Sequence, residues 1–188
     1  WKEYDKKDTK ELEALCKEYR KFLNHGKTER ECVKYIVELA KEAGYQDLND
    51  IKKSGRMLKS GDKVYAVNMK KAIALFQIGA DPIVEGMNIL GAHIDSPRMD
   101  VKQNPLYEDT DFAYLDTHYY GGIKKYQWVT LPLAIHGVVA KKDGQVVDIV
   151  IGEDDKDPIF CVTDLLIHLA GEQMDKKAAK VVEGEQLD

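Results

Sequence analysis

The residues best suited to chemistry in this chain are a histidine and an aspartate two positions apart, His93 and Asp95, in the segment NILGAHIDSPR at residues 88–98. A neutral imidazole nitrogen is a common metal ligand, and a nearby carboxylate can orient the ring. Pro97 opposes a helix after the pair because it has no N–H donor and restricts the residue before it. The pattern predicts a metal ligand with its orienting carboxylate. Taken alone, it also fits a histidine that is satisfied by a loop carboxylate.

The residues before His93 predict the element that carries it. Residues 87–92 form a short apolar run, typical of a strand covered on both faces by helices. In open α/β sheets, ligands bind beyond the carboxyl ends of the strands. We therefore expect His93 at the place where such folds perform chemistry.

Longer blocks around this pair resemble one family. GAHIDSPR, together with GDKVYAVNMKKAIALFQIG before it and YYGGI and DPIFCVTDLLIHLA after it, resembles the aspartyl aminopeptidase and aminopeptidase I family of dinuclear zinc exopeptidases. The resemblance covers nearly the whole chain. It implies that His93 is a ligand of one zinc ion and that Asp95 is the active-site residue that orients it. It also implies two zinc ions per subunit of a full-length enzyme, with cobalt or manganese as further candidates.

The resemblance implies an aminopeptidase that releases N-terminal residues from peptides, acidic residues among them, with a metal-bridged hydroxide as nucleophile. The family's other ligands and its general base would lie downstream of this chain. We therefore expect the 188 residues to be the N-terminal part of a longer protein and to be inactive alone. A related zinc deacylase would share the His-x-Asp loop, but the SPR continuation and the LLIHL segment favour the aminopeptidase.

His168, in the LLIHL segment, is the second catalytic residue that the resemblance implies. Residues from Thr163 to about Val182 predict a helix, because apolar side chains recur at helical spacing. In the family, a histidine at the matching place reaches from a dimerisation insertion into the neighbouring active site, where it can stabilise developing negative charge. From the residues alone, His168 is a surface or core-edge histidine. The resemblance also implies dimers that combine into dodecamers.

The N-terminal half predicts an α/β fold. Thr9 or Asp8 can cap a first helix that ends at Gly26, and Thr28 with Glu31 forms a capping box for a second. Residues 60–68 and 70–79 then predict two strands joined by a turn. With the strand at 87–92, these elements indicate part of a zinc-exopeptidase-like α/β/α catalytic domain, which we place at residues 1–102.

Residues 103–188 predict a β-rich dimerisation insertion. A polar connection at 104–111 should precede strands at 114–120, 127–139 and 146–151, with glycine-containing turns between them. The final EGEQLD reads as a second polar connection.

Composition excludes several function classes. With 44% hydrophobic and 32% charged residues the chain is globular, and its net charge of -5 argues against nucleic acid as the main partner. The apolar run 129–140 is too short to cross a membrane as a helix. Three cysteines at long spacing, Cys16, Cys32 and Cys161, predict buried, reduced thiols in a cytoplasmic protein.

The alternative to an enzyme is a non-catalytic assembly or binding module that keeps the fold.

Overall fold

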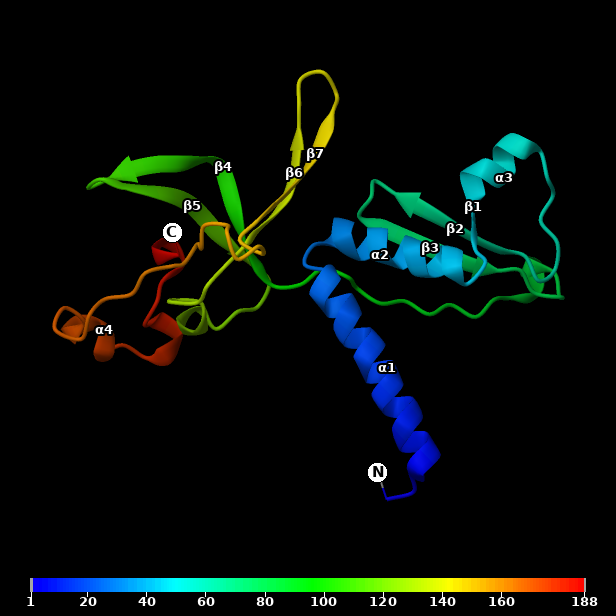
Figure 1. Cartoon of the computed structure of the whole chain (residues 1–188), viewed down its shortest axis with the longest axis horizontal. Coiled ribbons are helices and arrows are strands. Elements are labelled where there is room, and N and C mark those ends of the chain that lie inside the picture. Colours follow the sequence, from blue (N-terminus) through cyan, green and yellow to red (C-terminus); the bar gives the residue numbers. More distant parts are fainter. Residues whose placement is uncertain (1, 188) are drawn as a thin grey trace. The chain divides into compact units, whose positions relative to one another are not determined.

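The structure is a computed structural model that describes residues 2–187 (Figure 1). It contains two compact units, which divide between Asp95 and Ser96, and each is described by itself. The predicted domain boundary at residue 102 lies inside strand β4 (Arg98–Asp109). No helix in the described part of the chain is long and apolar enough to cross a membrane.

Two capped helices begin the N-terminal unit, α1 (Lys6–His25) and α2 (Glu29–Glu42). The predicted capping box of α2 is confirmed, because the Thr28 hydroxyl accepts from the Glu31 N–H and the Glu31 carboxylate accepts from the Thr28 N–H at 2.9 Å. The predicted cap of α1 is wrong. Asp5 caps this helix, and Asp8 is the third helical residue, whose carboxylate accepts from the Asp5 N–H.

A small sheet packs against α2. Its strands are β1 (Gln46–Asp47), β2 (Lys63–Asn68) and β3 (Ala72–Gln77), in the order β1-β2-β3. The predicted β2–β3 hairpin is confirmed, with Tyr65 opposite Leu75. The short helix α3 (Leu48–Ser54) was not predicted. The unit's buried side chains come from α2, α3 and β2, and they are Cys32, Val33, Ala40, Ile51, Val64 and Tyr65.

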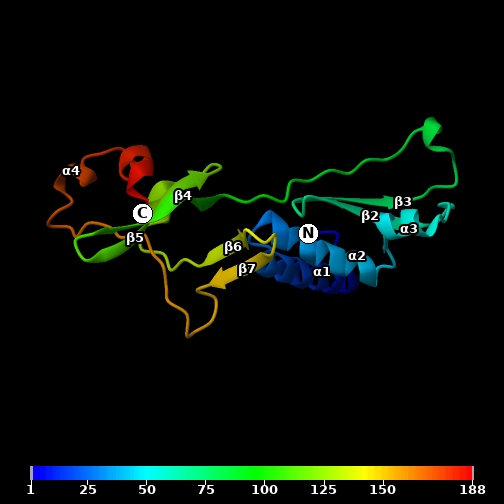
Figure 2. The ribbon, with the colours of Figure 1, turned by 90° about the horizontal axis from the view of Figure 1, so that it is seen from above.

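The predicted strand at residues 87–92 is wrong. After the 3-10 turn η1 (Ile83–Glu85), the chain continues as an extended segment without ladder hydrogen bonds, drawn in green in Figures 1 and 2. Ile89 and Leu90 are 81% and 97% exposed instead of buried. A strand exists only where a neighbour accepts and donates its backbone hydrogen bonds. In residues 2–187 no strand lies in register with this segment.

The named strands of the C-terminal unit form two separate hairpins. One joins β4 to β5 (Phe112–Tyr120), and the other joins β6 (Ile135–Ala140) to β7 (Val146–Ile151). The predicted strands near 114–120 and 146–151 are confirmed. The predicted polar connection at 104–111 is wrong, because pairing with β5 keeps this polar sequence in β4, with a register shift between Val101 and Leu106. The expected strand 127–139 begins only at Ile135, since Thr130 has φ 60° and Pro132 follows it.

The predicted helix from Thr163 to Val182 is also wrong. This region contains only the four-residue helix α4 (Gly171–Met174) and the 3-10 turn η3 (Ala178–Lys180), and a second 3-10 turn, η4 (Gly184–Gln186), follows it. An amphipathic helix gains its stability by burying its apolar face. Leu165, Leu166 and Leu169 have no such cover, and each is more than half exposed.

The core of the C-terminal unit forms where the chain end meets the β4–β5 hairpin. Val162, Val182 and Leu187 are buried together, and Met99, Ile123 and Val129 pack against them. The expectation of a polar connection at residues 183–188 is therefore wrong at Leu187, which is fully buried. The Thr117 hydroxyl of β5 donates to the Leu187 carbonyl and fixes this end of the chain on the hairpin.

Replacing Thr28 by alanine should lower the free energy of unfolding by about 1 kcal/mol, because the Glu31 N–H loses its acceptor. The measurement is a urea titration followed by circular dichroism. Thr28→Ser is the matched control, since it keeps the hydroxyl, and it should remain near the parent value. An alanine variant as stable as the parent would show that the capping box contributes nothing.

Candidate functional site

The structure brings the two residues of the predicted metal site together. The imidazole Nδ1 of His93 lies 3.1 Å from the backbone carbonyl of Asp95 and 3.2 Å from its carboxylate Oδ1. This contact orients the ring and leaves Nε2 as the nitrogen that can bind a ligand. The His93 side chain is 83% exposed, so Nε2 is open to an incoming group.

The described part of the chain supplies one candidate metal ligand, the imidazole of His93, and does not form a complete metal site. Among residues 2–187 there is no group of three or more His, Cys, Asp and Glu side chains that could hold a metal ion. Tight zinc sites use three or four protein ligands. The residues fit zinc at His93, with Asp95 beside it, and further ligands must come from elsewhere for a tight site.

The loop that carries His93 is held by a cysteine that the sequence did not single out. The buried thiol of Cys32, on α2, donates to the backbone carbonyl of Ile94 across 3.6 Å. Burial raises the pKa of the Cys32 thiol, and the carboxylates of Glu31 and Glu29 raise it further. The thiol therefore stays protonated near neutral pH and keeps its donor.

The expectation of three buried thiols is wrong for Cys16 and Cys161, which are exposed; only Cys32 is buried. Cys16 lies on α1, of which no residue is buried, and Cys161 lies beside the buried Val162. The small apolar character of cysteine permits burial but does not require it. Whether each cysteine is buried therefore depends on the tertiary structure and not on its residue type.

The charged residues that follow the loop are engaged with one another. Arg98 donates through Nε to Asp100 at 2.7 Å, and its guanidinium lies 4.3 Å from the centre of the Tyr120 ring. Lys102 lies 2.8 Å from Asp116, whose hydrogen bond raises the pKa of this lysine. These pairs stabilise the β4–β5 hairpin, so neither cation is a ready partner for a substrate carboxylate.

His168 lies in an exposed turn of the C-terminal unit. The turn is closed by the Leu169 N–H, which donates to the Leu166 carbonyl at 2.8 Å. His93 and His168 belong to different units. The structure shows that His168 is accessible, and its catalytic role stays a prediction.

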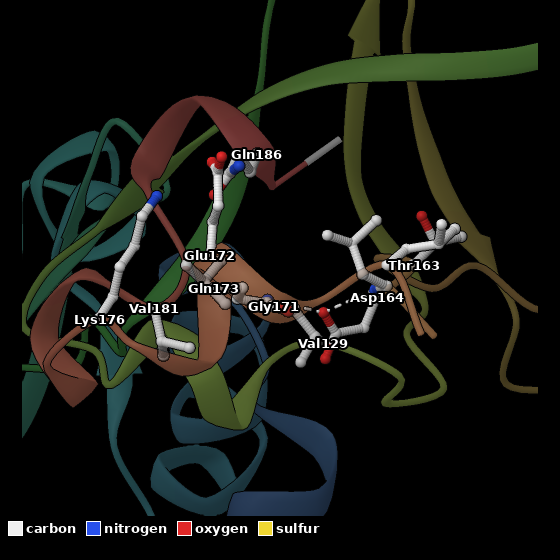
Figure 3. A pocket seen from close by; sticks show the side chains of 12 residues that line it. Val129, Thr163, Asp164, Gly171, Glu172, Gln173, Lys176, Val181 and Gln186 are labelled. Atoms are coloured by element: carbon white, nitrogen blue, oxygen red, sulfur yellow. Dashed lines mark hydrogen bonds between the residues drawn. The ribbon is translucent and has the colours of Figure 1, made fainter. Parts of the chain in front are cut away.

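A hollow of about 610 Å³ lies next to this turn (Figure 3). Gln173 donates to the Asp164 carboxylate at 2.9 Å across one side of it. Other side chains that line it include Val129, Leu165, Leu169, Glu172, Lys176 and Val181. The lining mixes apolar side chains with single charges, and its carboxylates, Asp164 and Glu172, do not belong to any group of three or more possible metal ligands among residues 2–187.

Comparison with known proteins agrees with this fold. The "Probable M18 family aminopeptidase 1" of Clostridium acetobutylicum is 59% identical over 188 residues, which are all of this chain and 40% of that protein. The crystal structure of an M18-family aminopeptidase from Thermotoga maritima has a TM-score of 0.88 at 45% identity and is matched over 39% of its length. The chain therefore spans about two fifths of the relatives that it matches.

A more distant structure shares the fold alone. The mApe1 dodecamer of S. cerevisiae has a TM-score of 0.67 at 19% identity, over 86% of this chain and 37% of that one. The expected mixed α/β class is confirmed by these likenesses.

The family that the sequence motifs indicated is confirmed. The family model described as "Aminopeptidase I zinc metalloprotease (M18)" matches residues 22–187, which include both His93 and His168. The chain belongs to the M18 family of zinc metalloproteases.

Proposed function

We propose that this chain is the N-terminal part of a zinc aminopeptidase that removes single N-terminal residues from peptides. The observation that carries the proposal is the orientation of His93, whose Nδ1 faces Asp95 while Nε2 stays open. Membership of the M18 family supports it. Preference for acidic N-terminal residues is part of the same proposal, by resemblance.

In this proposal His93 binds one of two zinc ions through Nε2, and Asp95 keeps the ring in the required tautomer by accepting from Nδ1–H. The zinc ions supply Lewis-acid chemistry that activates water and polarises the peptide carbonyl. Cobalt and manganese bind the same types of ligand, so they remain candidates beside zinc. The other ligands and the general base belong to the part of the longer protein beyond this chain.

The exposed surface supports the view that this chain packs against further protein. It exposes 15459 Å², whereas two separate folded units that together have this mass would expose roughly 11,000 Å². Part of this exposed surface is apolar: five side chains between Ile83 and Leu90 are more than 60% exposed. We propose that residues 1–102 are completed as a catalytic domain by the remainder of the longer protein.

We further propose that residues 103–188 form a dimerisation insertion and that His168 acts in a neighbouring subunit's active site. Leu165, Leu166, Ile167 and Leu169 are all more than half exposed around His168, as expected of a segment that a partner covers. The likeness to a protein described as a dodecamer supports assembly of dimers into a dodecamer. The three cysteines without a disulfide support a cytoplasmic location.

The isolated 188-residue chain should bind zinc weakly and show no aminopeptidase activity, because one imidazole and one carboxylate cannot replace the waters of a zinc ion efficiently. Isothermal titration with zinc chloride measures the binding. His93→Ala should abolish the weak zinc binding that the isolated chain shows. Tight uptake of two zinc ions, or chelator-sensitive activity, would contradict this expectation.

In the full-length protein, His93→Ala should abolish aminopeptidase activity, and Asp95→Asn should reduce activity or zinc affinity by about 10- to 100-fold, because an amide orients the imidazole less well. Initial rates on Asp, Glu and Leu substrates, with and without chelator, measure the effect. His25→Ala is the control, since this exposed histidine ends α1 far along the sequence from the loop. A full-length protein without activity or metal would favour the non-catalytic assembly module.

Subunit mixing tests the role of His168. Co-assembly of full-length His93→Ala subunits with full-length His168→Ala subunits should restore part of the activity that each variant lacks. A site with intact His93 would then receive His168 from its neighbour. If His168 served its own subunit, no mixed site would be complete, and the rate of the mixture would equal the mean of the two variants.

A further inference from the structure

The segment that leads to His93 has little contact with the rest of the N-terminal unit. Every residue from Gly79 to His93 is exposed, and Ile94 and Asp95 are the first that are partly buried. A loop that must hold a ligand in a fixed direction needs an anchor, because free backbone rotation would change the direction of the side chain. The anchor must therefore act at Ile94 or Asp95.

The Cys32 thiol is in position to be that anchor. Its hydrogen bond to the Ile94 carbonyl is the one hydrogen bond from another element to residues 87–94 in the described part of the chain. The Ile94 carbonyl belongs to the peptide group that joins Ile94 to Asp95. Holding that group restrains the backbone between His93 and Asp95, and with it the contact in which the His93 Nδ1 lies 3.2 Å from the Asp95 Oδ1.

The turn between the two helices leaves space for this thiol. A Cβ at Gly26 would lie 2.6 Å from the Cys32 sulfur and 3.2 Å from the Phe22 carbonyl. Gly26 has φ -100°, which any residue can adopt, so the close sulfur atom is what excludes a side chain here. The placement of the thiol thus involves α2, the α1–α2 turn and the loop together.

We propose that Cys32 is a positioning residue, whose thiol holds the Ile94 carbonyl and thereby sets the direction in which His93 presents Nε2. This proposal rests on the proposed function, because positioning His93 matters for activity only if His93 binds the metal. The competing explanation is that Cys32 only fills space in the core. The two differ in what serine should do, because serine keeps the donor and loses the sulfur volume.

The test measures the NMR signals of the Ile94 carbonyl carbon and of the His93 ring in this chain. Cys32→Ala should shift both, because the carbonyl loses its donor and the ring loses its fixed direction. Cys32→Ser should return both toward the parent. The signals of the β2–β3 hairpin should stay unchanged in both variants. Cys16→Ala is the matched control, because that thiol is exposed.

Equal effects of alanine and serine would overturn the proposal in favour of space filling, and so would unchanged Ile94 carbonyl and His93 ring signals in Cys32→Ala. If Cys32→Ala unfolds, Gly26→Ala decides, since it keeps the thiol and displaces it. This variant should shift the same two signals, and no shift would overturn the proposal. Loss of zinc affinity by Cys32→Ala in the full-length protein, rescued by serine, is the second readout. If His93→Ala leaves that affinity intact, the proposed function fails while the NMR result on the loop stands.

Discussion

The packing of α2 against strand β2 supports the rest of the N-terminal unit. Val33 and Ala40 of the helix and Val64 and Tyr65 of the strand are among the few side chains removed from water, so most of the unit's hydrophobic stabilisation arises there. The capping box that begins α2 sets where this helix starts. On the same helix, the buried thiol of Cys32 donates to the Ile94 carbonyl, so it connects the core of the unit to the loop that carries His93.

The C-terminal unit is stabilised differently, because two-stranded hairpins cannot bury a face by themselves. Its core instead depends on residues that return late in the chain, Val162, Val182 and Leu187. Charge pairs such as Lys102 with Asp116 add specificity at the surface of the hairpin. The exposed turn around His168 is thus supported by a small core whose residues lie far apart in the sequence.

Both candidate residues lie next to apolar segments that this chain leaves in water. Ile89 and Leu90 precede His93, and Leu166 and Ile167 precede His168. A folded protein seldom exposes such contiguous apolar side chains unless something covers them. The relative in Clostridium acetobutylicum is more than twice as long as this chain. Under the proposed function, the packing that covers these segments would also bring the other metal ligands and the substrate to the two histidines.

Sequence alone determined the features that depend on neighbours in the chain. The Thr28 capping box, the β2–β3 hairpin and the pairing of His93 with Asp95 are of this kind, because each involves residues a few positions apart. Periodicity and apolar runs were misleading at residues 87–92 and 163–182, because a strand needs a partner and a helix needs a surface to bury its face. The role of Cys32 could not be read from sequence, since its hydrogen bond joins residues 62 positions apart and exists only when α2 and the loop are folded together.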